Sequence, residues 1–440
     1  MNVLLVGSGA REHCIAEALT KSGRVKLYTY GKTKNPGILA LSEHYEQGDV
    51  LDFSTLLDFA KKIKPDFAFI GPDDPIGAGA ADALLSLDIH SVAPLATVAR
   101  LESSKGFTRD LLRKYEIPGN PKFKVFLNSD GIREFLKELG ENFVVKADGL
   151  MGGKGVKVAG DHLQNHESAE AFALECLEKS GRVVIEEKLI GQEFSLMSFV
   201  DGKNVVDMVP VQDHKRAYVG DKGPNTGGMG SFSAENHLLP FLRQSDIDEA
   251  HEISVKVTSA LFQETGILYR GIMYGGFMAV RDGVRLIEYN ARFGDPEVMN
   301  VLPILETDFV EICEAILAGT LDRTKIVFKN KATVCKYIVP EGYPDHPKAG
   351  YEIKIDTAKV PQDVRMYYAS VDLKDGALYL SSSRAIAFVG IGDTIAEAEE
   401  KAQHAISTVS GPVFFRKDIG TEALLRQRID MMRTLRAIAA

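Results

Sequence analysis

The sequence predicts a multidomain protein of mixed α/β and α+β class, and three observations support this. Its 440 residues exceed one typical core, since domains average about 150 residues. Short apolar runs alternate with helical patterns near the N-terminus, as in a parallel sheet. The hydrophobic fraction of 45% and charged fraction of 26% are those of a globular chain able to bury large cores.

The chain divides into three parts. Residues 1–102 carry the pattern of a βαβ domain, with strands expected at 3–6, 25–30 and 67–70 and helices at 11–21 and 78–87. Residues 103–325 read as α+β, with a glycine-rich hairpin, a polar glycine stretch and a helix near 246–265. Residues 326–440 return to strands and close with helices near 394–409 and 421–438.

Charge and hydropathy narrow the class of partner. The formal net charge is -9 and no segment concentrates Lys and Arg, which argues against a nucleic-acid surface. No apolar run approaches the roughly 20 residues of a membrane span, and residue 1 is followed directly by a strand pattern rather than a signal peptide. We therefore expect a cytoplasmic enzyme that acts on small molecules, without nucleic-acid or membrane partners.

The four cysteines do not suggest metal binding. Cys14, Cys176, Cys313 and Cys335 lie far apart in apolar surroundings, without CxxC or Cys/His spacing. We expect buried free thiols.

A glycine loop follows the first expected strand. Residues 7–13 (GSGAREH) open a helix, where backbone N–H groups and the helix dipole can hold a phosphate. A dinucleotide fingerprint would need glycine where Glu12 stands and an acidic residue after the second strand, which ends at Tyr30-Gly31-Lys32. A nicotinamide oxidoreductase is therefore disfavoured, and a plain strand-to-helix turn is equally compatible. Asp73, after another strand, would lie at the same sheet edge or cap a helix.

A second glycine-rich segment, residues 146–158 (KADGLMGGKGVKV), connects two expected strands. It is not a Walker A loop, because Gly155 rather than Ser or Thr follows Lys154. Its small residues would let the loop fold over a triphosphate, with amide donors and Lys154 facing the oxygens and Lys146 at the strand edge. A flexible surface hairpin is the alternative.

Residues 183–193 (VVIEEKLIGQE) are expected to form a strand that leaves into a linker with carboxylates at both ends. Such a linker can offer backbone groups to adenine and a carboxylate to ribose hydroxyls. Surface charge alone is an equally compatible interpretation.

Residues 286–297 (LIEYNARFGDPE) contain a candidate metal pair. Strand alternation puts Glu288 and Asn290 on one face, and two oxygen ligands suit magnesium, which completes its shell with phosphate and water. Arg292 would project from the same face if the strand continues. A structural salt-bridge cluster is the less favoured alternative.

Taken in order, these segments resemble the ATP-grasp ligases, and among them the phosphoribosylamine–glycine ligases, over almost the whole chain. The most specific matches are residues 212–216 (QDHKR), 223–230 (GPNTGGMG), 290–297 (NARFGDPE) and 415–420 (FRKDIG). The resemblance implies an N-terminal pre-ATP-grasp domain at 1–102, a two-lobed ATP-grasp domain at 103–325 with a small lid lobe at about 122–190, and a β-rich C-terminal domain with closing helices at 326–440.

The resemblance also implies a reaction and its residues. ATP would activate glycine as glycyl phosphate for attack by 5-phosphoribosylamine, an early step of purine (IMP) biosynthesis. The implied ATP-binding residues are Lys105, Lys146, Gly152, Gly153, Lys154, Gly155, Glu186, Glu187, Lys188, Leu189 and Glu193. The implied metal ligands, for Mg²⁺ or Mn²⁺, are Glu288 and Asn290, and the implied catalytic residues are Arg292, Lys154 and Asp213. The implied substrate-binding residues are Gly9, Ala10, Arg11, Asp73, Asp213, Lys215, Asp295 and Arg384.

Two alternatives remain beside the oxidoreductase: another ATP-grasp carboxylate–amine ligase of purine metabolism, and a catalytically silent nucleotide-binding module. GPNTGGMG and FRKDIG favour the glycine enzyme, and the lysines, Glu288, Asn290 and Arg292 argue against a silent module. A monomer and a homodimer are equally compatible with the sequence.

Overall fold

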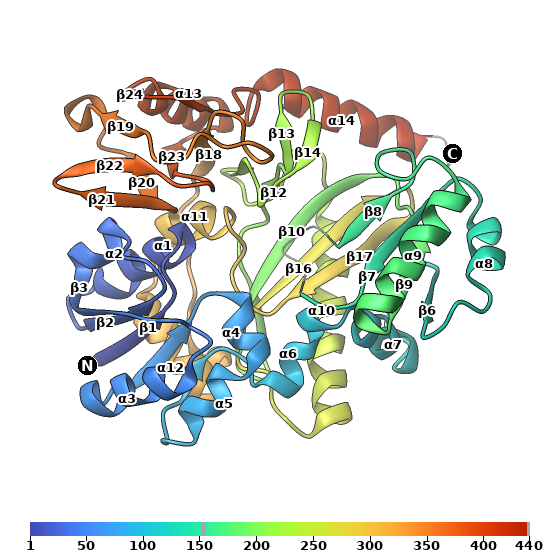
Figure 1. Ribbon diagram of the computed structural model, residues 1–440, viewed down its shortest axis with the longest axis horizontal. Coiled ribbons are helices and arrows are strands. Elements are labelled where there is room, and N and C mark those ends of the chain that lie inside the picture. The colour runs from blue at the N-terminus through green and yellow to red at the C-terminus, as the bar shows by residue number, and fades with distance from the viewer. Residues whose placement is uncertain (151–154, 438–440) are drawn as a thin grey trace.

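The computed structural model describes residues 1–150 and 155–437. Its N-terminal part contains a five-stranded sheet in the order β3-β2-β1-β4-β5 (Figure 1). All its strand pairs are parallel. The strands are β1 (Asn2–Val6), β2 (Lys26–Gly31), β3 (Ser42–Gln47), β4 (Phe67–Ile70) and β5 (Ser91–Val92). The helices are α1 (Ala10–Thr20), α2 (Pro36–Leu41), α3 (Phe53–Ile63), α4 (Asp73–Ala78) and α5 (Ala80–Leu85).

The strand order reverses between β1 and β4. Loops that leave the two strands at such a switch point diverge and open a crevice at the carboxyl edge of the sheet. The loop from Gly7 to Gly9 and the turn at Asp73 therefore lie side by side. The prediction of one helix at 78–87 was wrong in its bounds, because two helices, α4 and α5, occupy this region. Gly79 separates them, since its left-handed backbone at φ +98° cannot continue a helix.

The next lobe has its own four-stranded sheet, in the order β6-β9-β7-β8. The linking helices α6 (Ala96–Ser103) and α7 (Lys105–Lys114) precede it. Its elements are β6 (Phe123–Phe126), α8 (Ile132–Leu139), β7 (Phe143–Ala147), β8 (Val156–Val158), α9 (His166–Ser180) and β9 (Val183–Glu187). The expected strand–loop–strand arrangement is confirmed, since β7 pairs antiparallel with β8. This lobe also has its own apolar core, as expected of a unit that moves as one body.

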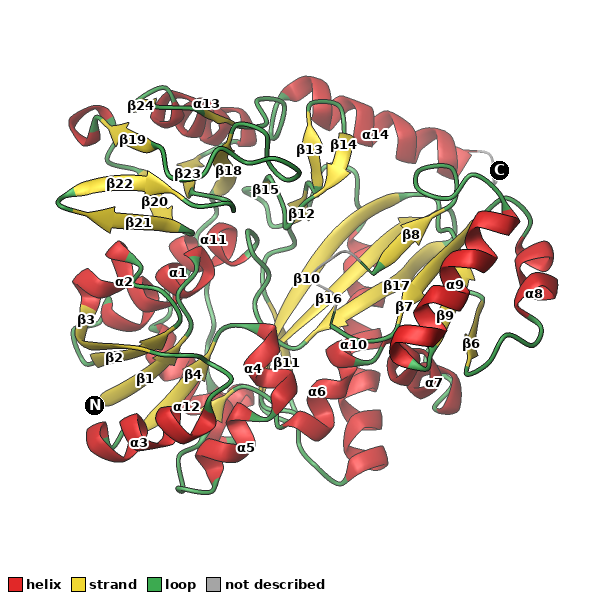
Figure 2. Ribbon diagram, viewed as in Figure 1, coloured by secondary structure: helices red, strands yellow, loops and turns green. Residues whose placement is uncertain are grey.

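A larger antiparallel sheet, in the order β11-β10-β16-β17, lies beside this lobe (Figure 2). Its strands are β10 (Gln192–Val200), β11 (Val205–Asp207), β16 (Gly271–Val280) and β17 (Gly283–Asn290), and α10 (Gln244–Thr265) packs against it. Then follow α11 (Val298–Val301) and α12 (Phe309–Ala318). β17 ends at Asn290, so the strand does not continue to Arg292, which was the condition for Arg292 to share a strand face with Glu288 and Asn290.

A fourth sheet joins the middle of the chain to its C-terminal part. The strands β12 (Gln212–Asp213) and β15 (Gly230–Ser233) pair with each other, and β15 pairs with β18 (Ala332–Pro340). The sheet continues through β23 (Ile386–Gly392) and β20 (Val364–Tyr368), with β25 (Val413–Phe414) beside β18. Segment 212–233 is therefore held by the C-terminal sheet, although it belongs to the middle of the sequence.

Smaller elements complete this part. A hairpin of β13 (Arg216–Tyr218) and β14 (Lys222–Asn225) projects between β12 and β15. A second small sheet contains β19 (Glu352–Ile355), β21 (Val371–Lys374), β22 (Ala377–Leu380) and β24 (Val409–Ser410). The helices are α13 (Ile395–Ile406) and α14 (Glu422–Ala437), and α14 runs from the C-terminal domain toward the ATP-grasp lobes (Figure 1).

One continuous apolar core joins the N-terminal sheet, the large antiparallel sheet and part of the C-terminal sheet. The prediction for the cysteines is confirmed, since all four are buried and free. Among the described helices, none is both long and apolar enough to cross a membrane.

Candidate active site

Lys146 bridges the lid sheet and the large sheet. Its Nζ forms an ion pair with the buried carboxylate of Glu186 and donates to the backbone oxygen of Ile287 at 3.2 Å. Arg109 holds the same carboxylate through Nε at 2.8 Å and Nη2 at 3.1 Å, and it also donates to the Ile287 oxygen at 2.7 Å. Burial opposes ionisation of Glu186, but the two cations outweigh it and hold the pKa below its usual range. The ammonium is therefore positioned before any nucleotide arrives.

The linker after β9 turns two of its side chains onto the lid lobe. Glu187 accepts from the backbone N–H of Lys122 at 2.8 Å, and Lys188 donates to the backbone oxygen of Ala159 at 2.8 Å. A hollow of about 570 Å³ lies against Glu187, Lys188 and Leu189 and the turn between β16 and β17. The linker thus borders a surface hollow, as a segment that contacts a planar ligand would.

The start of α7 lies at the entrance to the glycine-rich loop. Lys105 donates from Nζ to the backbone oxygen of Gly149 at 3.0 Å. Gly155 closes the other end, because its oxygen accepts from the Ala147 N–H at 2.8 Å. Gly152, Gly153 and Lys154 lie outside the described residues. The described ends of the loop therefore converge on Lys105 and Lys146.

Glu288 and Asn290 lie at the end of β17, opposite Gly276 and Tyr274 of β16. Burial disfavours the ionised form of Glu288, but Lys215, Lys105 and Lys146 lower its pKa overall. Within residues 1–150 and 155–437, no three His, Cys, Asp or Glu side chains form a metal-binding cluster. One carboxylate and one amide oxygen fit a hard cation such as Mg²⁺, which takes its remaining ligands from phosphate and water.

Arg292 lies two residues beyond the end of β17. Its guanidinium pairs with Glu102 at 3.1 Å and donates to the Phe293 oxygen at 3.2 Å, while its buried Nε has no hydrogen-bond partner among the described residues. Burial works against the charge, but Glu102 and Asp73 raise the pKa of Arg292 above its usual value. A charged guanidinium with a free N–H is suited to an incoming anion.

The first glycine loop reaches the same place from the N-terminal domain. Arg11 donates to Glu12 at 2.6 Å and to the Phe293 oxygen at 3.3 Å, and the Gly9 N–H donates to Glu12 at 2.7 Å. A Cβ on Gly7 would lie 2.5 Å from the Glu12 side chain, and one on Gly71 would lie 2.2 Å from it. The glycines therefore make room for a carboxylate, which would repel the pyrophosphate of a dinucleotide.

Asp73, at the start of α4, faces two of these cations. Burial raises its pKa, but Arg292 and Arg11 outweigh burial and lower it overall. Ala10 begins α1 and is fully buried, so its backbone and not its side chain borders the cleft. The N-terminal domain thus contributes one cation and one anion to the site.

Asp213 and Lys215 come from the segment held by the C-terminal sheet. Lys215 pairs with Glu193 at 2.6 Å. Burial and then the nearby Glu297 raise the pKa of Asp213 well above its usual value. Glu297 itself is 2% exposed and accepts from the hydroxyl of Tyr274 at 2.8 Å. The half-buried Asp213 beside the buried Glu297 creates a place that attracts a cationic group.

Arg384 and Asp295 join the C-terminal domain to the cleft. Arg384 donates from Nη1 to the backbone oxygens of Gly227 at 2.8 Å and Gly228 at 3.0 Å, and it pairs with Asp295 at 3.2 Å. Its guanidinium lies 4.4 Å from the Tyr337 ring centroid. Tyr337 also donates to Asp295 at 2.7 Å. Arg384 therefore positions three loops in addition to any contact with a substrate.

The sequence interpretation assigned no role to Arg109, Glu102 and Glu297. Arg109 follows Lys105 by one helical turn, so helix spacing could have indicated that both face the same cleft. Glu102 lies three residues before Lys105, and Glu297 lies two residues after Asp295. No sequence signal shows that Glu102 pairs with Arg292, because that contact joins residues 190 positions apart.

Two lobes that enclose lysines, with a Glu/Asn pair at a strand end and an arginine beside it, define an ATP-grasp ligase. The family models place this chain more narrowly. They match the N domain of phosphoribosylglycinamide synthetase at residues 1–102, its ATP-grasp (A) domain at 103–298 and its C domain at 333–422. The chain therefore belongs to the phosphoribosylglycinamide synthetase family.

Individual proteins agree with this assignment. A phosphoribosylamine–glycine ligase of Methanococcus maripaludis is 48% identical, and the match covers 99% of this chain and 100% of the relative. The crystal structure of the Thermotoga maritima phosphoribosylamine–glycine ligase superposes with a TM-score of 0.80 at 30% identity, covering 95% of this chain and 100% of that one. A biotin carboxylase domain from Hydrogenobacter thermophilus, in complex with magnesium ADP, superposes at 0.72 with 16% identity, covering 98% of this chain and 93% of that one. This last likeness shows the fold alone.

Proposed function

We propose that this chain joins the carboxylate of glycine to the amine of 5-phosphoribosylamine, forming glycinamide ribonucleotide while ATP becomes ADP and phosphate. Membership of the family makes it an ATP-dependent carbon–nitrogen ligase of purine biosynthesis. The observation that carries the proposal is the meeting of four distant segments around residues 290–297. Arg11, Glu102 and Arg384 all bind groups within that segment, and Asp213 lies beside Glu297.

The two sides of the cleft suit the two halves of the reaction. A carboxylate reacts with an amine only when one oxygen becomes a good leaving group, so glycine is first phosphorylated. Phosphoryl transfer between anions depends on positioned cations and donors rather than on a nucleophilic side chain. We assign Lys105, Lys146 and Lys154 to the ATP phosphates and Arg292 to the transferred phosphoryl group. The linker at 186–189 and Glu193 take adenine and ribose.

Glu288 and Asn290 are the residues we assign to a divalent metal, and we propose magnesium in preference to manganese. Such an ion would be held by these two side chains and would supply positive charge to offset that of the phosphates. The lid sheet carries the glycine-rich segment that would close over the phosphates. Closure would exclude the water that hydrolyses an acyl phosphate.

The remaining charged groups are assigned to the acceptor and to glycine. Gly9, Ala10, Arg11, Asp73, Asp295 and Arg384 are proposed to bind 5-phosphoribosylamine, and Asp213 and Lys215 are proposed to line the glycine position. Because the reaction draws on cellular ATP, we propose the cytoplasm as its location. The partners we propose are small molecules, with either a monomer or a homodimer as the working form.

The test is ADP release by purified protein with ATP, magnesium and glycine, with and without 5-phosphoribosylamine generated from ribose 5-phosphate and ammonia. We expect ADP and glycinamide ribonucleotide in equal amounts, and only when all components are present. ADP formed with another acid and amine would retain the ligase and overturn the substrates. No ADP with any pair would overturn the ligase as well.

A further inference from the structure

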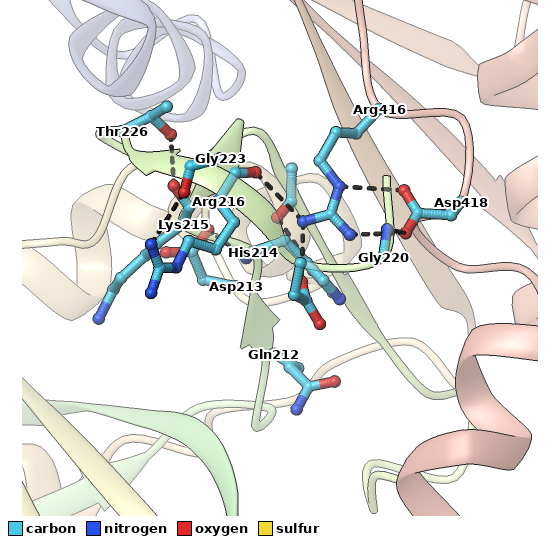
Figure 3. A network of polar contacts seen from close by, with 12 residues as sticks. Gln212, Asp213, His214, Lys215, Arg216, Gly220, Gly223, Thr226, Arg416 and Asp418 are labelled. Carbon is cyan, nitrogen blue, oxygen red and sulfur yellow. Dashed lines mark hydrogen bonds and ion pairs between the residues drawn. The ribbon is translucent and has the colours of Figure 1, made fainter. Parts of the chain in front are cut away.

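FRKDIG, residues 415–420, lies against the β13–β14 hairpin, which directly follows Asp213 and Lys215 in the chain. Arg416 is among the largest fully buried side chains in the described part of the protein, with 1% of its surface exposed. A guanidinium removed from water is stable only when its donors find acceptors. The network around Arg416 supplies them (Figure 3).

The donors of Arg416 reach both its own turn and the β13–β14 hairpin. Nε and Nη2 bind the two carboxylate oxygens of Asp418 at 3.0 and 2.6 Å. Nη1 binds the backbone oxygen of Arg216 at 3.2 Å and the carboxylate of Asp221 at 2.8 Å. Asp418 in turn accepts from the Gly220 N–H at 3.0 Å. The hairpin is therefore held at its base and at its tip.

The FRKDIG turn is itself fixed to the C-terminal sheet. Lys336 of β18 is fully buried and donates to the backbone oxygen of Lys417 at 2.9 Å, while Glu399 and Gln403 of α13 take its other N–H groups. Ile419 is fully buried, and a Cβ on Gly230 would lie 3.0 Å from it. Arg416 thus connects a rigid anchor to the hairpin.

Apolar packing holds the hairpin only in part, through the fully buried Ala217 and the Tyr218 ring, which lies 6.0 Å from that of Phe414. Tyr218 and Val219 at its tip are 47% and 45% exposed. In the described part of the chain, β13 and β14 pair with each other in a separate two-stranded sheet, so no larger sheet fixes the hairpin. Ion pairs and hydrogen bonds have defined directions, so they can fix one position where apolar contact is scarce. Arg428 of α14 adds to this by pairing with the other oxygen of Asp221.

Asp213 and Lys215, the two charged residues proposed to line the glycine position, come just before the hairpin in the chain and flank His214. In an extended chain successive side chains alternate, so Asp213 and Lys215 point to one side and His214 to the other. His214 is buried and its Nδ1 lies 3.3 Å from the Gly230 oxygen, on the side of the network (Figure 3). Lys215 on the opposite side pairs with Glu193 in the cleft. A shift of the hairpin would therefore act first on Lys215, which directly precedes β13, and through the backbone on Asp213, which β12 also pairs with β15.

We propose that Arg416 is a positioning residue for glycine: through Asp221, Asp418 and Arg216 it fixes the hairpin that places Asp213 and Lys215. The inference rests on the proposed function, because it assumes that Asp213 and Lys215 line the glycine position. It requires no contact between Arg416 and any substrate. Among the described ATP residues, Lys105, Lys146 and Glu186 are not bound by Arg416, and Glu193 is linked to it only through Lys215. The KM for ATP should therefore change less than the KM for glycine.

The test compares Arg416→Gln with Arg436→Gln. Arg436 is a largely buried arginine on α14, with 6% of its side chain exposed, and its partner is Asp246 at 2.6 Å rather than a hairpin residue. We expect Arg416→Gln to raise the KM for glycine by about 10- to 100-fold, since small misplacements of binding groups have effects of that size. The KM for ATP should change less than about threefold. Arg436→Gln should lower the melting temperature comparably without changing the ratio of the two KM values.

A milder pair of variants covers the case in which Arg416→Gln fails to fold. Asp221→Asn removes one charge from the network and leaves the Arg416 to Asp418 pair, and Arg416→Lys should restore part of the glycine KM. Equal changes in both KM values, or none in the folded variants, would overturn the positioning role while the wild-type activity stood. An inactive wild type would instead overturn the proposed function.

Discussion

The nucleotide side and the substrate side of the cleft hold their charges differently. On the nucleotide side, Lys146 is already paired with Glu186, which Arg109 also binds, and the three residues lie within 78 positions of sequence. On the substrate side, Arg292 pairs with Glu102 but keeps an Nε without a hydrogen-bond partner among the described residues, and Asp73 of the N-terminal domain also faces it. The first region is a preformed binding surface. The second depends on how the domains meet.

That difference has a functional meaning. A cation neutralised in advance binds ATP without a large reorganisation, whereas a partly free guanidinium is available for charge that develops during phosphoryl transfer. Substitutions on the nucleotide side should therefore change mainly the KM for ATP. Those on the substrate side should change kcat or the KM of the acceptor substrates.

The largest effect is expected for Arg292→Lys. Lysine keeps the charge but loses the planar fork, so one donor to the transferred phosphoryl group is lost. We expect kcat to fall by about 100- to 1,000-fold with a small change in the KM for ATP. Steady-state ADP release measures both. A fall of less than about threefold would place Arg292 outside the reaction centre.

Lys146→Met should act on the other side. The change removes an ammonium from the ATP phosphates and leaves the buried Glu186 with Arg109 alone. We expect the KM for ATP to rise by about 10- to 100-fold, from a lost charge-assisted hydrogen bond of about 1.5–3 kcal/mol. The KM for glycine should remain near that of the wild type. A glycine effect equal to the ATP effect would contradict the separation of the two sides.

Arg384→Ala should raise the KM for 5-phosphoribosylamine far more than that for ATP, by about tenfold. Arg384 binds the oxygens of Gly227 and Gly228 and pairs with Asp295, so its removal also loosens these loops. The comparison is made with 5-phosphoribosylamine generated in the assay. Equal effects on both KM values would remove Arg384 from the substrate site.

Stability should fall below neutral pH because of two buried histidines. Burial lowers the pKa of His214 to about 3, helped by Arg416 and Arg428, and burial lowers that of His13 to about 4. The unfolded chain takes up protons below pH 6.5 while the folded chain does not, so stability is lost as pH falls from 6.5 toward 4. Each histidine contributes about 1.4 kcal/mol per pH unit in that window.

Urea unfolding of His214→Gln at pH 7, 6 and 5 checks this. His13 and His214 together make the free energy of unfolding depend on pH in this window. In the variant, this pH dependence should fall to about half. His251→Gln is the control: its partner Asp207 raises its pKa, so its contribution to stability is lost as pH rises above 6.5 and the slope between pH 6 and 5 should stay unchanged. An unchanged slope in His214→Gln would show that His214 is not held neutral.

The smallest effect is expected at the surface. Arg24 pairs with Asp308 at 2.6 Å, but its side chain is 48% exposed. Arg24→Gln should change the free energy of unfolding far less than Arg436→Gln does and leave every KM unchanged, because solvent screens an exposed ion pair. A loss as large as that of Arg436→Gln would contradict the distinction between buried and exposed pairs.

The same contrast explains how much the sequence predicted. Strands such as Phe67–Ile70 were predicted because their apolar periodicity is local, and the lysine, linker and Glu/Asn motifs of the nucleotide side lie in short segments. The break at Gly79 was missed because an apolar pattern continues across it. The pairing of β15 with β18 was not predicted, because β-pairing between residues about 100 positions apart leaves no local pattern.

The site residues show the same limit. Asp213, Lys215 and Arg384 were nominated by resemblance to the family, but their surroundings were not. Neither the Glu297 carboxylate beside Asp213 nor the loops bound by Arg384 follows from spacing. These contacts depend on the packing of the C-terminal sheet against the rest of the chain. The sequence therefore predicts the chemistry of a segment more readily than it predicts which distant residues contact that segment.

The most direct test of a single cleft in which glycine is phosphorylated is the fate of its carboxylate oxygen. With glycine labelled by ¹⁸O in both carboxylate oxygens, one oxygen leaves with the phosphoryl group and the other stays in the new amide. The account predicts one ¹⁸O atom in each phosphate released, measured by mass spectrometry alongside glycinamide ribonucleotide. Phosphate without ¹⁸O, formed together with the product, would contradict glycyl phosphate as the intermediate.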